Sequence, residues 1–264
     1  MDPSLSVLLA FLPFVLSHIG LGAPRVRSAL VRWLGVWGFT WLFFAVAALT
    51  FGLAISTYAG VRGTGAPGPA LGDVPVLREL LIGALVLGIV LMAGSLAEFG
   101  RSPYSITRPG VSEPTGLSRV TRHPFFVGVG LLGGGHALLA THLPGAIAMG
   151  TLGVFALVGS HFQDRKLVAQ RGQDYADYVR STSLVPFVAI LAGRQRLVVR
   201  EISATGLAIG LGFAWGLRFV HPHIFDYGGM YVIGATVGGA LLILAGEARR
   251  MRHAAPDVAI GTSG

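Results

Sequence analysis

Residues 79–99 read ELLIGALVLGIVLMAGSLAEF, and this stretch decides the fold. Eighteen uncharged residues separate Glu79 from Glu98. As an α-helix they would extend roughly 27 Å, at about 1.5 Å per residue. The hydrocarbon core of a bilayer is about 30 Å thick, and an uncharged apolar run of this length is typical of a transmembrane helix. The stretch therefore predicts a membrane span.

The rest of the chain repeats this pattern. Six further apolar windows lie at Leu5–Leu21, Trp33–Thr57, Pro124–Ala140, Pro144–His161, Ile202–Phe219 and Met230–Glu247. The 264 residues are 53% hydrophobic and 12% charged, with a mean hydropathy of +0.68. Soluble domains carry about 25% charged residues. We predict an all-α, polytopic bundle of about seven transmembrane helices, which excludes an ordinary soluble enzyme.

The basic residues predict the orientation of the bundle. Seventeen of the 20 Lys and Arg residues lie after the first, third and fifth spans and in the tail, whereas Arg62, Arg78 and Arg218 lie in the other loops. Basic loops stay in the cytoplasm, so we expect the amino terminus outside and the carboxyl terminus inside. The predicted location is a bacterial inner membrane. Arginines in short loops indicate contact with lipid headgroups rather than nucleic acid.

Histidines are the candidate functional residues. The chain has no cysteine, which excludes disulfides, thiolate metal sites and a cysteine nucleophile. Ionisable side chains inside a membrane are costly and usually functional, and here they are His18, His136 and, at the inner end of the fifth span, His161. Since no carboxylate lies in the middle of a span, these histidines favour a metal or haem over a proton pump.

Each histidine also has a plain structural interpretation. His136 ends a glycine-rich run in which Gly130 and Gly134 are spaced as a helix-packing pair. His18 suits a hydrogen bond between helices, and His161 lies in a charged helix end that suits topology alone. His123 precedes the helix-starting Pro124 and is suited to cap that span. Composition and spacing leave both interpretations open.

Several motifs, in order along the chain, resemble the NnrU family. They are Ser17–Leu21, Arg122–Gly128, Gly135–Leu138, Gly159–Leu167, Tyr175–Tyr178 and Thr182–Phe187. We place the end of the resemblance at about residue 195. The expected organisation is a haem-binding membrane domain over residues 1–195, two additional helices over 196–248, and a disordered cytoplasmic tail over 249–264.

The NnrU family is similar to the plant ζ-carotene isomerases, which are membrane enzymes that bind haem b. The resemblance implies that His18 and His136 ligate the iron, with His123 and His161 in a polar site at the cytoplasmic face. It implies redox-gated cis–trans isomerisation of a lipid-soluble polyene and an electron donor of unknown identity. The plant enzyme has a cysteine three residues before its second ligand, where this chain has Gly133.

Two other functions stay open. Arg122–His123–Pro124, followed by Tyr175 and Tyr178, also resembles the isoprenylcysteine carboxyl methyltransferases. That likeness implies S-adenosylmethionine at the cytoplasmic face, although this chain has Gln163 and Asp164 where that family has an acidic pair. The third possibility is a non-catalytic haem protein that supports nitrite or nitric oxide respiration.

Overall fold

The computed structural model describes residues 1–103 and 110–254, and within these ranges the chain is helical with no strand. Five long helices have proline in their first turn, where the missing N–H costs nothing. The long helices are α1 (Pro3–Gly22), α2 (Pro24–Val61), α3 (Pro75–Ala97), α5 (Pro124–Leu139), α6 (Leu143–Ser181), α8 (Ala204–Val220) and α9 (Met230–Ala254). Between them lie α4 (Leu117–Val120), α7 (Val188–Leu191) and the 3₁₀ turns η1 (Leu71–Asp73), η2 (Phe99–Arg101), η3 (Val199–Glu201) and η4 (His221–His223).

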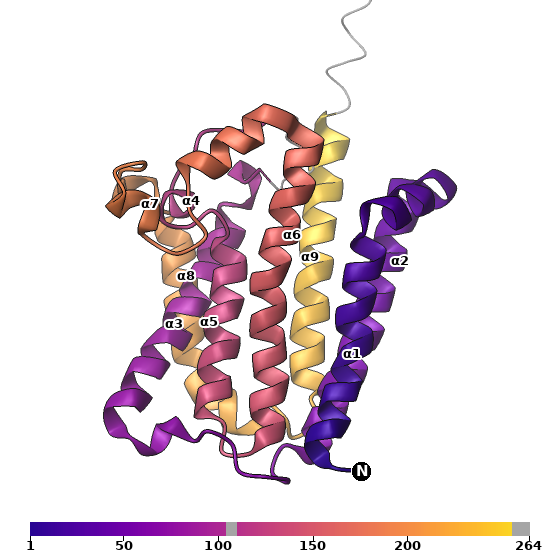
Figure 1. The fold of residues 1–264 in the computed structure, drawn as a ribbon, viewed down its shortest axis with the longest axis vertical. Helices are drawn as coiled ribbons and strands as arrows, with labels where there is room; N and C mark the ends of the chain where they lie inside the picture. Colours follow the sequence, from indigo (N-terminus) through magenta and orange to yellow (C-terminus); the bar gives the residue numbers. More distant parts are fainter. Residues whose placement is uncertain (104–109, 255–264) are drawn as a thin grey trace, which may run out of the picture.

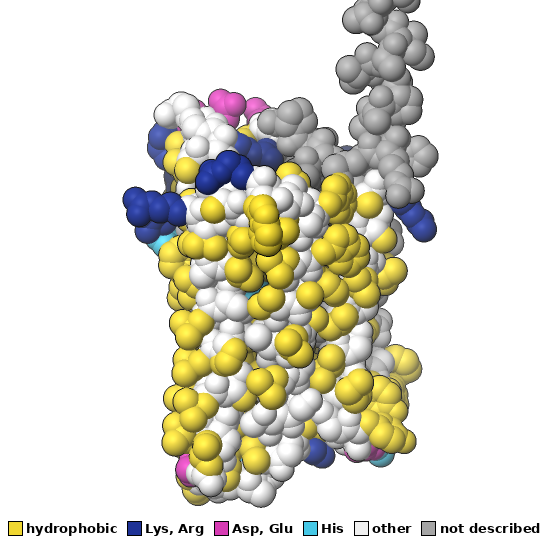
Figure 2. All heavy atoms as spheres, turned by 90° about the vertical axis from the view of Figure 1, so that its right-hand side faces the viewer, with side chains coloured by type: hydrophobic (Ala, Val, Ile, Leu, Met, Phe, Trp, Pro, Cys, Tyr) yellow, Lys and Arg dark blue, Asp and Glu magenta, His cyan; other side chains and the backbone are white. Residues whose placement is uncertain are grey.

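The chain is a helical membrane protein. Helices α1, α2, α3 and α6 are long and apolar enough to cross a bilayer, and residues 124–139 and 230–246 form shorter apolar helices. Apolar side chains cover the flank of the molecule in Figure 2. Leu49, Leu80 and Val154 are more than 60% exposed, which suits a surface that faces lipid. Each predicted window coincides with a helix, while the count of seven spans and their orientation stay predictions.

The long helices run side by side, and their two ends differ (Figure 1). One end carries α4 and α7, and the amino terminus lies at the other. We call the first the basic end, because most of the Lys and Arg residues lie there, in the first turns of α2, between α3 and α5, in the last turns of α6 and in the segment after it. Most of the Lys and Arg side chains visible in Figure 2 gather at this end. The basic end is the one for which the sequence predicts a cytoplasmic location.

Glycines let three helices approach closely at the centre of the bundle. A Cβ atom on Gly128 of α5 would lie 2.6 Å from the Gly88 carbonyl oxygen of α3. One on Gly133 would lie 2.6 Å from the Gly153 backbone nitrogen of α6. Small residues at such contacts are the usual basis of helix packing in membranes. The packing interpretation of the glycine run is therefore confirmed. It includes Gly130 and Gly134, because a Cβ atom on Gly153 of α6 would lie 3.3 Å from the Gly130 carbonyl oxygen and 3.1 Å from the Gly134 nitrogen.

Helix α8 packs on α3 through glycines of its own. A Cβ atom on Gly206 would lie 2.8 Å from the Gly94 Cα, and one on Gly210 would lie 2.8 Å from the Val90 Cα. Helix α9 packs against α2 instead. The two carboxyl-terminal helices therefore have different neighbours and do not form a separate pair beside the rest of the bundle.

Two helices bend at glycines near the basic end. Gly35 in α2 has φ 71° and Gly172 in α6 has φ 60°, conformations that favour glycine. After Gly172, α6 turns across the end of the bundle (Figure 1). The motif Tyr175–Tyr178 belongs to this bent part. Helix α9 continues to Ala254, into the predicted tail, and residues 255–264 lie outside the described residues.

Candidate functional site

A buried carboxylate, Asp164, organises the basic end. Its Oδ1 accepts hydrogen bonds from His123 Nε2 at 2.7 Å and from the Tyr175 hydroxyl at 2.8 Å. Its Oδ2 accepts from Arg122 Nε at 2.8 Å. His123 and Tyr175 are fully buried, and Asp164 is 7% exposed. The four residues join the start of α5, the part of α6 beyond the predicted span, and the segment after the bend at Gly172.

Opposing effects set the protonation of this carboxylate. Burial alone raises the pKa of Asp164, but the hydrogen bonds from His123 and Tyr175 and the charge of Arg122 lower it below its ordinary value. Asp164 is therefore ionised at neutral pH and accepts every bond described above. Removing one member of such a buried ion pair leaves an uncompensated charge, which typically costs about 3–5 kcal/mol.

The backbone around this network is fixed by further bonds. The Thr121 hydroxyl donates to the Leu184 carbonyl at 2.6 Å, and the Arg122 amide donates to the Ser183 carbonyl at 2.9 Å. These bonds clamp the chain just before α5 to the chain just after α6. His123 takes the position that precedes α5, as the sequence suggested, but its side chain makes no capping bond to that helix and turns to Asp164 instead.

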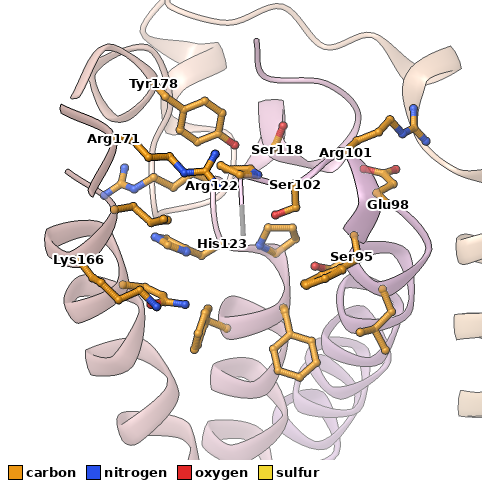
Figure 3. Close-up of a pocket in the computed structure, with 18 of the residues that line it drawn as sticks. Ser95, Glu98, Arg101, Ser102, Ser118, Arg122, His123, Lys166, Arg171 and Tyr178 are labelled. Carbon is orange, nitrogen blue, oxygen red and sulfur yellow. The ribbon is translucent and has the colours of Figure 1, made fainter. Parts of the chain in front are cut away.

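A cavity of about 550 Å³ lies beside this network, and Figure 3 shows Arg122, His123, Lys166 and Tyr178 around it. Its apolar lining comes from Leu96, Phe99, Phe125, Phe126 and Leu167. Its cationic lining comes from Arg27, Arg101, Arg122, Lys166 and Arg171. The cavity is thus apolar on one part of its wall and strongly basic on another, at the end of the bundle that we expect to face the cytoplasm.

Two glutamates that the sequence did not single out close this end. Glu98 accepts from the backbone amides of Leu117 at 3.1 Å and Ser203 at 2.9 Å. Arg119 donates two hydrogen bonds to the Glu201 carboxylate, from Nε to Oε2 at 2.7 Å and from Nη2 to Oε1 at 3.1 Å. The bond from Arg119, then the one from the Gly116 amide, lower the pKa of Glu201. Together they tie α3 and α4 to the start of α8.

His18 lies near the basic end of α1 among aromatic rings. Its ring centroid is 4.3 Å from that of Phe14, 5.0 Å from that of Phe43 on α2 and 5.4 Å from that of Phe155 on α6. Its Nδ1 is 2.9 Å from the Phe14 carbonyl oxygen. Because a carbonyl only accepts, Nδ1 carries the proton and the neutral ring keeps a lone pair on Nε2.

His136 has the same local bond in different surroundings. Its Nδ1 is 2.9 Å from the Leu132 carbonyl oxygen, which again leaves Nε2 as the acceptor. Its ring stacks on His221 of η4, with the centroids 6.0 Å apart and the planes 19° from parallel. This neighbour could not be predicted from sequence spacing, since His221 lies 85 residues further along the chain.

The two predicted haem ligands fit an iron singly but are not brought together. A histidine whose second nitrogen donates to a carbonyl is the usual form of a metal ligand. However, His18 lies four residues from the end of α1, and His136 lies twelve residues into α5. Along the bundle this places them roughly 6 and 18 Å from the basic end. The two histidines are thus offset by roughly 12 Å along the bundle.

The other predicted site residues do not all lie at the same place. His123 belongs to the Asp164 network, while His161 is exposed on α6, with its ring centroid 6.4 Å from that of Phe162. Of the residues that carry the methyltransferase resemblance, Arg122, His123 and Tyr178 line the cavity. Tyr175 stacks on Tyr178, and Arg165 is exposed outside the cavity lining.

Gly133 has no room for the side chain that the plant enzyme carries there. A Cβ atom would lie 2.5 Å from the Met149 carbonyl oxygen and 2.6 Å from the Gly153 nitrogen, both in the α6 backbone. A thiol at this position would require α5 and α6 to separate. The departure from the plant sequence is thus part of how these helices pack.

The chain matches the family model described as NnrU protein over residues 6–228. This protein belongs to the NnrU family. The match includes α8, so the prediction that it ends near residue 195 was wrong. The error arose because glycine-rich α8 carries no polar motif, although Ser203, Gly206 and Gly210 attach it to α3.

Two curated relatives are plant enzymes. The chain is 29% identical over 228 residues to the chloroplastic 15-cis-zeta-carotene isomerase of Arabidopsis thaliana, covering 81% of this chain and 60% of the relative. It is 35% identical over 83 residues to the enzyme of that name from Zea mays, covering 31% of this chain and 23% of the relative. The chain thus spans well under two thirds of either relative. No solved structure matches it significantly.

Proposed function

We propose that the protein is a membrane isomerase that acts on a long, lipid-soluble polyene, with its reaction centre at His18. The observation that carries the proposal is the environment of this histidine. Its ring is surrounded by Phe14, Phe43 and Phe155 from three helices, and its Nε2 lone pair is uncommitted. The relation to two carotene isomerases supplies the class of reaction.

Aromatic walls suit a flat, conjugated molecule. Phenyl rings offer large apolar faces and edges that pack against an extended π system. Two neighbours of His18 on α1, Leu16 and Ile19, are 62% and 43% exposed. On a membrane-spanning helix such side chains face lipid, so an apolar substrate reaches this region from the bilayer without passing through water.

We propose haem b as the cofactor of this isomerase. His18 would hold it through Nε2, and the family resemblance proposes His136 as the second ligand. When bound, the iron would supply a one-electron couple and a Lewis acid. The protein's own part is to fix the His18 tautomer through the Phe14 carbonyl and to exclude water with the surrounding rings. Redox gating additionally requires an external one-electron donor.

Isomerase activity is tested in a bacterial host that accumulates a cis-polyene. The cis-to-trans ratio in the lipid extract is measured by liquid chromatography. The wild type should convert the substrate, and His18→Ala should lower the conversion at least about tenfold, as expected for loss of a metal ligand. His142→Ala, in the turn before α6, is the control and should leave it unchanged. Equal conversion by wild type and His18→Ala would disprove the assignment.

The second ligand is tested with the same assay. If the mapping from the plant enzyme holds, His136→Ala abolishes conversion and His161→Ala does not. The reverse result would assign the ligand to His161, which the structure places on the surface of α6. His221→Ala would not serve as a neutral control, because the His221 ring stacks on His136. Haem retention without turnover of any polyene would favour the non-catalytic alternative.

The methyltransferase alternative is supported by one feature, the convergence of His123, Tyr175 and Tyr178 at the basic end. The charge of the cavity argues against it. S-adenosylmethionine carries a sulfonium cation, and the cavity lining already holds five cationic side chains against the one carboxylate of Glu98. Calorimetry with the purified protein should show no tight binding of S-adenosylmethionine. Tight binding by a haem-free preparation would reverse this ranking.

A further inference from the structure

The cavity at the basic end holds more positive charge than its own acids compensate. Lys166 and Arg27 both line it, and neither makes an ion pair among the described residues. Burial, then the charge of Arg27, lower the pKa of Lys166. Two cations that face one enclosed space repel each other, and an anion between them would relieve that repulsion.

The nearby carboxylates are already engaged. Glu98 lines the cavity but accepts two backbone amides, those of Leu117 and Ser203. Asp164 holds Arg122, His123 and Tyr175. Both acids therefore stabilise the fold around the cavity, and neither makes an ion pair with Lys166 or Arg27 among the described residues. The single charge of Glu98 stands against five cationic side chains in the lining.

A buried hydroxyl points independently to a missing ligand. Tyr178 is 4% exposed, and its hydroxyl has no hydrogen-bond partner among the described residues. The ring lines the cavity, and its oxygen points into it (Figure 3). The neighbouring Ser118 hydroxyl donates to the Thr115 carbonyl and accepts from the Thr115 amide, and it has one acceptor lone pair left. Buried hydroxyls are normally hydrogen-bonded, so an orphan one at a cavity calls for a partner.

The apolar part of the wall defines the rest of the ligand. Phe125 and Phe126 begin α5, and Leu167 lies on α6 one residue from Lys166. The cavity of about 550 Å³ is in the usual range for small-molecule sites. It lies where the apolar helices end and the basic loops begin, which is the level expected for phospholipid headgroups.

We propose that this cavity binds an amphiphile with a phosphate head and an apolar chain. Lys166 and Arg27 provide charge, the Tyr178 hydroxyl donates a hydrogen bond, and the phenyl rings of α5 contact the start of the chain. A membrane phospholipid and a soluble phosphate share the chemistry of the head, and the apolar wall favours the lipid. The site is separate from His18, so it stands or falls independently of the isomerase proposal.

The test uses the full chain in phosphatidylcholine nanodiscs, titrated calorimetrically with dioctanoyl phosphatidic acid, with protein-free nanodiscs as the blank. Lys166→Gln should weaken binding about tenfold, the usual effect of losing one charge-assisted bond. Tyr178→Phe removes only the orphan hydroxyl, keeps the fold, and should weaken binding about threefold. The matched control is Arg165→Gln, which changes an exposed neighbour outside the cavity lining.

One further titration, with inorganic phosphate, completes the test. Inorganic phosphate alone should bind at least about tenfold more weakly than the lipid, because it lacks the apolar chain. Equal binding of the two would overturn the amphiphile. An equal loss in Arg165→Gln and Lys166→Gln would reduce the effect to general surface charge, and unchanged binding in both Lys166→Gln and Tyr178→Phe would remove the site.

Discussion

The histidines of this protein fall into two groups with opposite bonding. His123, at the basic end, is fully buried and donates to a carboxylate 41 residues away in sequence. His18 and His136 lie within the bundle and bond only the carbonyl four residues earlier in their own helices. The first is committed to holding the fold together, whereas the other two keep an acceptor nitrogen for something else. Bonding state thus separates a histidine that holds the fold together from the two for which we propose a ligand role.

The largest effect should come from breaking the Asp164 network. Asp164→Asn leaves Arg122 buried without a counter-charge, so we expect a loss of about 3–5 kcal/mol in unfolding free energy. The measurement is denaturant or thermal unfolding in detergent. Asp174→Asn changes an exposed carboxylate ten residues further along α6 and should have almost no effect. A loss no greater than that of Asp174→Asn would mean that the network does not support the fold.

A smaller loss of stability should follow from adding a side chain beside His136, where α5 packs closely on α6. Gly133→Cys places a side chain against the α6 backbone three residues before His136, and overpacking of this kind costs about 1–3 kcal/mol. Gly134→Cys enters open space and is the matched control. Unfolding of the two variants in detergent makes the comparison. If Gly133→Cys is as stable as Gly134→Cys, helices α5 and α6 are further apart than described.

The smallest effect concerns Glu201, a more exposed counterpart of Asp164. Its folded pKa lies below the unfolded value because Arg119 donates to it. The stabilisation is therefore complete above the unfolded pKa and disappears as the pH falls through the folded one. The unfolding free energy of Glu201→Gln should therefore fall less steeply than that of the wild type as the pH is lowered. The two free energies should be most similar at low pH. An unchanged pH profile would show that the pair contributes nothing.

Hydropathy was enough to predict where the long helices lie, because an apolar run of span length has few alternatives. Their bends were not predictable in this way. Gly35 breaks α2 just inside the predicted window, and an isolated glycine in an apolar run gives no sign of its positive φ. The motif Arg122–His123–Pro124 was recognised, but its partner Asp164 is set by how α5 and α6 pack.

The same limit applies to the candidate sites. Glu98 and Glu201 read as ordinary charges at helix ends, and only the fold brings them to the amides of Leu117, Ser203 and Gly116. His136 was recognised as a membrane histidine, but its stacking on His221 depends on a turn that closes 85 residues later. Sequence periodicity describes one helix at a time, so contacts between distant segments were outside its reach.

The central claim is that His18 holds a redox cofactor, and the absorption spectrum of the detergent-purified protein tests it most directly. We predict a Soret band and a reduced-minus-oxidised difference typical of haem b in the wild type. The haem content should fall at least about tenfold in His18→Ala. His142→Ala should keep the wild-type spectrum. A His18→Ala protein with a full haem content and an unchanged difference spectrum would contradict the account.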